Sequence, residues 1–232
     1  MHGRVAVITG GFGVVGKTIV ARFAAAGYSV AALGRAPAEV AERPGGSAAT
    51  LVIGGVDLTD SAATQKAMDA SVDKLGALDV LVNVAGGFRW QLFGEGDLSV
   101  WDLMYDVNLK TALVATRAAL PGLLKSPSAR IVNVGAGAAA DRSRAGMGAY
   151  TAAKAGIQKL TESLADELKD RSVCVNAVLP GTVDTPQNRL DMPNADYSRW
   201  VAPADLAAVV LFLASVEARA VNGAALAVAG RS

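Results

Sequence analysis

The sequence predicts an α/β fold in which one doubly wound parallel sheet carries helices on both faces. Short runs of β-branched and other apolar residues alternate with stretches of helical periodicity along all 232 residues. These runs are apolar at almost every position, which is typical of strands buried on both faces of a parallel sheet. No linker rich in Pro, Gly or Ser, internal repeat or charge block divides the chain, so we expect a single domain over 1–232.

The first strand is predicted over 4–9, where a short β-branched run leads through a glycine-rich turn into a helix over 17–24. Residues 36–48 are rich in Ala, Pro and Gly and are expected to form a loop or a shortened helix. Thr59 or Asp60 can cap the next helix by accepting hydrogen bonds from its first amides. The remaining strands are expected over 29–33, 49–54, 77–83, 130–134, 173–178 and 224–228, and the remaining helices over 61–75, 98–125 and 148–170.

The turn after the first strand is the first candidate binding site. Glycines there allow close approach of a pyrophosphate, and the N-terminus of the following helix attracts phosphate groups. A glycine triplet is weak evidence alone, but one placed between a first strand and a first helix is typical of a dinucleotide site. The cofactor-binding residues predicted in this turn are Gly10, Phe12, Gly13, Val14, Val15 and Gly16.

The end of the second strand bears on which dinucleotide is preferred. A carboxylate in this region would bind the ribose diol of NAD, whereas a cation accommodates the 2′-phosphate of NADP. The strand ends at Gly34, no acid is present there, and Arg35 follows at once. We therefore expect NADP(H) to be preferred, with NAD(H) left open as a cofactor and a surface loop arginine as the alternative interpretation of Arg35.

Tyr150 and Lys154 form the candidate catalytic pair. They are four residues apart in a predicted helix, so both side chains lie on one face about one turn from each other. An ammonium beside a phenol favours the phenolate, and we expect it to lower the pKa of Tyr150 by ~2–3 units, toward working pH. The spacing alone is equally compatible with an exposed Tyr and Lys on a solvated helix face.

Several function classes are excluded by composition. His2 is the only histidine, which rules out a Ser-His-Asp triad and a multi-histidine metal site. Cys174 is the only cysteine, so no internal disulfide or thiolate cluster forms, and its apolar neighbours predict a buried, inert thiol. A net charge of +1 without a basic cluster argues against nucleic acid. No apolar run reaches the ~20 residues of a membrane span, and the N-terminus lacks a signal-peptide layout, so we expect a soluble, cytoplasmic protein.

Six groups of residues occur in a fixed order along the chain: Thr9-Gly10-x-x-Gly13-x-x-Gly16, Asp57, Asn83-Val84-Ala85-Gly86, Asn108, Tyr150-x-x-x-Lys154 and Pro180-Gly181-Thr182-Val183-Asp184-Thr185. Together they resemble the short-chain dehydrogenase/reductase family over essentially the whole chain. The resemblance implies a Rossmann-type sheet of about seven strands and a nicotinamide cofactor. It also implies hydride transfer to a carbonyl or similar centre of a small-molecule substrate, and assembly into a homodimer or homotetramer through the helices over 98–125 and 148–170.

The same resemblance assigns roles to single residues. Asn108 would join Tyr150 and Lys154 as a catalytic group by anchoring a water that relays protons, and Lys154 would also hold the nicotinamide ribose. A polar group satisfied inside its helix is the alternative for Asn108, and a helix-entry carboxylate is the alternative for Asp57. The cofactor contacts that the resemblance implies are Asp57, Leu58, Asn83, Ala85, Gly86, Tyr150, Lys154, Pro180, Gly181, Val183 and Thr185.

The sequence departs from the family pattern in three places. The glycine spacing is shifted, with Gly13 in place of a later glycine, and Val84 stands where the commoner subfamily has a second Asn. The family's catalytic serine is missing: about thirteen residues before Tyr150 the chain reads Val134-Gly135-Ala136-Gly137-Ala138-Ala139. Ser143 is too close to Tyr150 in the chain to replace it with confidence.

A site with Tyr and Lys but no serine resembles one subgroup, dihydropteridine reductase. The similar segments lie over 84–88, 135–139, 146–150 and 177–189. This resemblance implies a quinonoid ring as substrate, because such a ring is already poised for reduction and needs the serine hydroxyl less. Asn108 and the Gly34-Arg35 pair depart from that subgroup.

Aromatic and methionine side chains gather in the loops that follow strands and in an expected lid over about 182–202. Loops at the carboxyl ends of such strands usually bind ligands, and a flat heteroaromatic substrate would suit these side chains. Anchoring of the loops is the equal alternative, because each ring can bury much apolar area. The predicted substrate-binding residues are Phe88, Trp90, Met147, Tyr197 and Trp200.

The sequence therefore predicts an NADP(H)-dependent reductase in which Tyr150 donates a proton to a carbonyl-type or quinonoid-type substrate, with no metal. Two alternatives remain. One is a ketone or 3-oxoacyl reductase of the same family that works through rearranged donors. The other is a dinucleotide-binding sensor that has lost catalysis with its serine, against which the presence of Tyr150, Lys154 and Asn108 argues.

Overall fold

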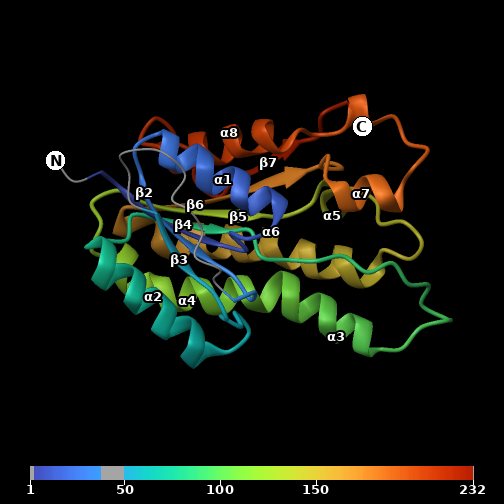
Figure 1. The fold of residues 1–232 in the computed structure, drawn as a ribbon, viewed down its shortest axis with the longest axis horizontal. Coiled ribbons are helices and arrows are strands. Elements are labelled where there is room, and N and C mark those ends of the chain that lie inside the picture. The colour runs from blue at the N-terminus through green and yellow to red at the C-terminus, as the bar shows by residue number, and fades with distance from the viewer. Residues whose placement is uncertain (1–2, 38–49, 232) are drawn as a thin grey trace.

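The computed structural model describes residues 3–37 and 50–231, so the predicted loop or shortened helix over 36–48 lies almost wholly outside the described residues. The described strands form one parallel seven-stranded sheet in the order β3-β2-β1-β4-β5-β6-β7, which confirms the predicted fold class (Figure 1). The strands are β1 Val5–Thr9, β2 Ser29–Leu33, β3 Thr50–Ile53, β4 Val80–Asn83, β5 Ala129–Val134, β6 Val173–Pro180 and β7 Ala225–Val228.

Helices cover both faces of the sheet. On one face α1 packs with α8, and on the other lie α2, α4 and α6 (Figure 1). Successive residues of a strand point to opposite faces, so Ile8 joins the core under α1 and α8 while Val7 joins the core under α2 and α4. The helices are α1 Val14–Ala25, α2 Ser61–Leu75, α3 Ser99–Tyr105, η1 Asp106–Lys110, α4 Thr111–Leu123, α5 Gly137–Ala140, α6 Gly148–Leu168, η2 Lys169–Arg171, α7 Pro186–Asp191, η3 Tyr197–Arg199 and α8 Pro203–Ala214.

The strand order places a crevice at the carboxyl ends of β1 and β4. The chain proceeds from β1 outward to β3 on one side and then returns to start β4 on the other side of β1. The loops after β1 and β4 therefore diverge, and open α/β sheets bind their ligands at this topological switch point. All the motifs that carry the resemblance end at this edge of the sheet.

The helix predicted over 98–125 is interrupted. A π-helical turn, η1, stands between α3 and α4 and contains the buried Asn108. Single π turns inserted into a helix are rare and frequently mark functional sites. No sequence pattern indicated it, because the apolar periodicity continues through the turn.

Other element ends differ from the prediction by a few residues. The fourth strand begins at Val80 rather than at residue 77, since the Asp79 carboxylate accepts a hydrogen bond from the Val5 amide at 2.8 Å. The sixth strand continues to Pro180, where the Gly181 amide donates to the Val228 carbonyl. Asp60, not Thr59, caps α2 by accepting hydrogen bonds from the amides of two first-turn residues.

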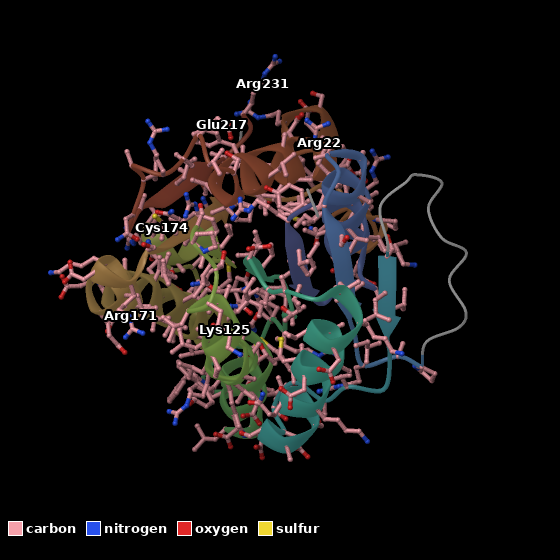
Figure 2. The ribbon with its side chains drawn as sticks, turned by 90° about the vertical axis from the view of Figure 1, so that its left-hand side faces the viewer. Arg22, Lys125, Arg171, Cys174, Glu217 and Arg231 are labelled. Carbon is pink, nitrogen blue, oxygen red and sulfur yellow. The ribbon has the colours of Figure 1, made fainter. Side chains whose placement is uncertain are left out.

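The prediction that Cys174 is buried is wrong: its side chain is partly exposed, and its sulfur lies 3.6 Å from the Arg219 carbonyl oxygen (Figure 2 labels Cys174). The reason is the position at which β7 starts to pair with β6. Strand β7 begins pairing only at Ala177 of β6, so the start of β6 has no strand beside it on that side.

Candidate functional site

The candidate catalytic side chains meet at the carboxyl edge of the sheet. Tyr150 and Lys154 lie on α6, Asn108 lies on η1, and Gly86 follows β4. A Cβ atom built on Gly86 would be 2.7 Å from Asn108 Oδ1 and 3.3 Å from Lys154 Nζ. The bare glycine backbone thus lies between an amide and an ammonium that are far apart in sequence.

Lys154 is buried, and its Nζ donates a hydrogen bond to the carbonyl oxygen of Val134 at 2.8 Å. Burial in an apolar surrounding penalises the charged form and lowers the pKa of Lys154 to about 8. The ammonium therefore stands at the end of β5, where the chain lacks the serine of the family.

The prediction that Lys154 lowers the pKa of Tyr150 is wrong in this structure. Burial instead raises the pKa of Tyr150 to about 12, because the phenolate would lose its hydration. The Lys154 ammonium does not offset this effect, since it is directed at the Val134 carbonyl. Phe88 contributes to the apolar surrounding: its ring meets the Tyr150 ring at 5.1 Å between centroids, with the planes at 88°.

Asn108 has its side-chain donors fully engaged. Its Nδ2 donates to the carbonyl oxygens of Gly87 at 2.9 Å and Met104 at 3.1 Å, and its Oδ1 accepts from the Gly87 amide at 3.1 Å. Two of these bonds form a closed pair with one glycine, so the side chain fixes the backbone after β4 rather than offering a donor to water.

One residue that positions this site belongs to the first motif but was given no role in the sequence analysis. Thr9, the last residue of β1, is buried, and its hydroxyl oxygen accepts hydrogen bonds from the amides of Val84 at 3.0 Å and Ala85 at 3.3 Å. A polar residue at the end of an otherwise apolar strand was the available signal. Asn83, one of the predicted cofactor residues, faces the interior instead, where its Nδ2 donates to Thr116 and Asn133.

The segment that replaces the family serine contributes backbone and small apolar groups. Ala136 is buried beyond the end of β5, and a Cβ on Gly135 would lie 2.6 Å from a methyl carbon of Leu179. The Ser143 hydroxyl forms a hydrogen bond with the hydroxyl of Thr151 at 2.7 Å. Thr151 is one residue beyond Tyr150, so Ser143 is tied to a neighbouring helix position.

Of the four glycines in the first turn, Gly10, Gly13 and Gly16 have different surroundings. Gly10 has a φ of +64°, and a Cβ there would lie 2.8 Å from the Ala85 Cα. A Cβ on Gly16 would overlap the carbonyl oxygen of Gly10. A Cβ on Gly13, by contrast, would meet nothing closer than that oxygen at 3.6 Å. Packing therefore explains two of the glycines and leaves Gly13, at the N-cap of α1, facing open space.

This turn fits a dinucleotide phosphate. The first amides of a helix have no partner within the helix, and together with its dipole they favour an anion. At α1 these are the amides of Val14, Val15 and Gly16, and no side chain caps them. The missing side chain of Gly13 leaves that end of the helix open to close approach.

We expect Gly16→Ala and Gly13→Ala to have opposite effects on folding and binding. Gly16→Ala should lower the thermal midpoint by several degrees, because its Cβ overlaps backbone that cannot move aside. Gly13→Ala should leave the midpoint of the unliganded chain within about two degrees yet weaken dinucleotide binding about tenfold or more. Differential scanning fluorimetry and fluorescence titration with NADPH measure the two quantities. Unchanged NADPH binding by Gly13→Ala would contradict the assignment of this turn.

Arg35 follows β2 at the same edge of the sheet. Its side chain is 69% exposed, and its guanidinium lies 3.6 Å from the Asp57 carboxylate. Asp57 accepts hydrogen bonds from the Thr59 amide at 2.9 Å and hydroxyl at 2.8 Å, and these bonds, more than Arg35, hold its pKa below the usual value. The Phe12 ring covers Gly34, where a Cβ would overlap it, while Leu58 is buried beside Asp57.

The predicted substrate residues fall into two groups. Phe88 and Trp90 lie against the start of α6: Phe88 contacts Tyr150, and the Trp90 ring lies on Gly146, next to Met147. The rings of Tyr197 and Trp200 instead pack on each other at 4.7 Å within the segment 182–202. The Tyr197 hydroxyl donates to the Pro193 carbonyl, which favours a loop-anchoring role for that residue.

The two ends of the segment 182–202 are joined to each other, and we call this junction the neck of the segment. Val183 pairs with Val201 in an isolated parallel bridge, the Asp184 amide donates to the Val201 carbonyl at 2.9 Å, and the Val201 amide donates to the Thr182 carbonyl at 2.8 Å. Beyond the neck, Thr185 caps α7 by accepting a hydrogen bond from an amide of that helix. The neck adjoins the end of β6 at Pro180 and Gly181.

Within the described residues, no group of three or more His, Cys, Asp or Glu side chains could hold a metal ion. Over the same residues, none of the helices combines the length and the apolarity needed to cross a membrane.

Comparison with known proteins decides the family. Residues 4–195 match the family model described as short chain dehydrogenase. The chain belongs to the short-chain dehydrogenase family. Its curated relatives include a 3-oxoacyl-[acyl-carrier-protein] reductase of Vibrio harveyi, 32% identical over 99% of this chain and 97% of the relative. An acetoacetyl-CoA reductase of Allochromatium vinosum is also 32% identical, over 98% and 97% of the two chains.

Solved structures of other short-chain dehydrogenases superpose over almost the whole chain. Carveol dehydrogenase of Mycobacterium avium in complex with NAD has a TM-score of 0.87 at 28% identity, covering 99% of this chain and 97% of that one. An NADPH-bound oxidoreductase of Pseudomonas aeruginosa, described as containing an atypical catalytic center, has a TM-score of 0.88 at 30% identity, covering 98% and 95%. A nicotinamide dinucleotide cofactor is therefore supported for this fold. The two curated relatives are a 3-oxoacyl-[acyl-carrier-protein] reductase and an acetoacetyl-CoA reductase, so they do not support the narrower resemblance to dihydropteridine reductase.

Proposed function

We propose that the chain is an NADPH-dependent carbonyl reductase acting on ketones of the 3-oxoacyl type, with Tyr150 as proton donor. The observation that carries the proposal is that Lys154 and Asn108 meet at Gly86 at the carboxyl edge of the sheet, with Tyr150 one turn before Lys154 on α6. The 3-oxoacyl and acetoacetyl-CoA reductases among the relatives support the substrate class.

In the proposed reaction each side chain has a distinct task. When bound, NADPH supplies the hydride to the carbonyl carbon. Tyr150 donates its phenolic proton to the carbonyl oxygen as negative charge develops there, and the high pKa of the buried phenol keeps that proton in place beforehand. Lys154, protonated at neutral pH, supplies a buried positive charge one helical turn from the phenolate that results. Asn108 holds the backbone of Gly87.

A quinonoid dihydropterin is the second candidate substrate, favoured by one observation. The segment over 135–139 carries no hydroxyl to polarise a demanding ketone. Loss of one such donor typically lowers turnover about 100-fold or more, and a quinonoid ring depends on it less. Steady-state assays with NADPH on a 3-oxoacyl thioester, simple ketones and quinonoid dihydropterin separate the candidates. Tight NADPH binding without turnover of any of them would favour the sensor and contradict an enzymatic function.

For the cofactor, we propose that the turn over 10–16 holds the pyrophosphate, that Asp57 lies beside the adenine, and that Arg35 meets the 2′-phosphate. The exposure of the Arg35 side chain at the end of β2 supports this. Lys154, Val183 and Thr185 would lie at the nicotinamide end, and the segment 182–202 would serve as the substrate lid. A homodimer or homotetramer remains part of the proposal, supported by the exposed apolar side chains Phe212 on α8 and Leu226 on β7.

Arg35→Ser should lower the ratio of kcat/KM for NADPH over NADH about 10- to 100-fold, because a charge-assisted contact to a phosphate contributes about 1.5–3 kcal/mol. Arg22→Ser, at the far end of α1, serves as the control and should leave the ratio unchanged. The ratio is measured from initial rates with each cofactor at a fixed substrate concentration. An unchanged ratio in Arg35→Ser would show that the 2′-phosphate is recognised elsewhere.

A further inference from the structure

Phe88 makes the only aromatic ring contact to Tyr150 within the described residues. The Phe88 ring is 43% exposed, and the Tyr150 side chain beside it is partly buried. The half-exposed Phe88 ring thus lies edge-to-face against the Tyr150 ring, at 5.1 Å between centroids and 88° between planes. Aromatic pairs prefer this edge-to-face geometry, and it restricts the orientations that each ring can adopt.

Side-chain hydrogen bonds fix the backbone of the residues that precede Phe88 in the loop after β4. The Thr9 hydroxyl fixes the amides of Val84 and Ala85. Asn108 then fixes Gly87 through both its amide and its carbonyl oxygen. The π turn that carries Asn108 is what brings this side chain to Gly87. A chain of direct contacts therefore runs from Asn108 through Gly87 and Phe88 to Tyr150.

We propose that Phe88 is a positioning residue for Tyr150 and that Asn108 acts on the reaction through Gly87 and Phe88. The inference rests on the proposed function, in which Tyr150 donates the proton. In a site whose 135–139 segment has no hydroxyl, the Phe88 ring supplies a contact that holds the phenol from another side. Asn108 acts by fixing the loop rather than by presenting a donor to a water molecule, because both hydrogens of its amide are bonded to carbonyl oxygens.

The primary test compares Phe88→Ala, Phe88→Tyr and Phe93→Ala. Phe93 lies in the same loop and is 75% exposed, but its ring meets Trp101 instead of Tyr150, which makes it a matched control. Phe88→Ala should lower kcat about 10- to 100-fold, the effect of a misplaced reacting group, and move the alkaline limb of the kcat pH profile toward lower pH. Phe88→Tyr should restore both quantities, and Phe93→Ala should change neither. Wild-type kcat and pH profile in Phe88→Ala would overturn the proposal.

A double-variant cycle tests the route from Asn108. If Asn108 acts through Phe88, Asn108→Ala combined with Phe88→Ala should lose no more kcat than the larger single variant. If the fold-losses of kcat in the two single variants multiply in the double variant, Asn108 acts by another path, such as a water relay. That result would overturn the proposed route through Phe88. If Asn108→Ala does not fold, Gly87→Pro tests the same link, because it removes the amide that donates to Asn108.

A measurement without substrate separates this inference from the proposed function. Ultraviolet titration of the tyrosines, with Tyr150→Phe as the reference that identifies the Tyr150 signal, gives its pKa in the unliganded chain. Phe88→Ala should lower that pKa toward the ordinary value by opening the phenol to water. A lowered pKa together with no turnover of any carbonyl would support the contact while the proposed function fails. An unchanged pKa would overturn the inference even if the enzyme reduces ketones.

Discussion

Tyr150→Phe should lower kcat/KM for ketone reduction about 100- to 10,000-fold, the range that a positioned proton donor contributes. The substitution removes one oxygen and keeps the ring that packs against Phe88. Within the described residues the Tyr150 hydroxyl makes no hydrogen bond, so the thermal midpoint should stay within about two degrees of the wild type. NADPH affinity should change by less than about threefold.

The control for this experiment is Tyr105→Phe, which removes a hydroxyl from an exposed tyrosine at the end of α3 and should leave kcat unchanged. Single-turnover measurements with NADPH establish that the loss lies in the chemical step rather than in product release. Turnover that survives Tyr150→Phe would refute the proton-donor role.

Lys154→Met should also lower kcat about 100-fold or more, because it removes a buried positive charge one helical turn from Tyr150 while keeping the length of the side chain. Lys159→Met provides the matched control: Lys159 is on the same helix, exposed, and paired with Glu162 at 2.7 Å. It should leave kcat unchanged. A Lys154→Met enzyme with wild-type turnover would exclude the ammonium from the reaction.

The same substitution has a signature in the pH dependence of folding. Burial lowers the pKa of Lys154 to about 8, so between that pH and the unfolded pKa near 10.5 the unfolded chain binds more protons than the folded one. The free energy of unfolding of the wild type should therefore rise with pH across this window, by up to about 3 kcal/mol. Lys154→Met should lack that rise. Urea unfolding at about pH 8 and about pH 10 measures the difference.

Much of the fold follows from local patterns in the chain. The strands β1, β4 and β5 are buried at every position because helices cover both sides of the sheet, and most of their residues are apolar, a pattern that is visible without a structure. Asp60 and Gly76, which stand at the two ends of α2, mark the helix in the sequence for the same reason that they stabilise it.

The parts that could not be predicted depend on contacts between distant residues. The π turn at Asn108 arises where its side chain bonds to Gly87, 21 positions earlier, and no local pattern encodes that contact. The pKa of Tyr150 likewise depends on how deeply the ring is buried, and the Tyr-x-x-x-Lys spacing gives only the proximity of the charge. Helical spacing placed the two residues on one face correctly and gave the wrong direction for the shift.

The bridge between Val183 and Val201 has a consequence for how this enzyme can diversify. Its two strands of backbone are joined by hydrogen bonds at the neck, so the residues between them form a nearly closed loop whose ends are already together. Lengthening a loop with fixed ends costs only about 0.6 kcal/mol for each doubling of its length. Insertions, deletions and new side chains beyond the neck can therefore accumulate without disturbing β6 or α8. Under the proposed function, in which this segment is the substrate lid, substrate range can thus change over generations while the sheet and the proposed proton-donating pair stay the same.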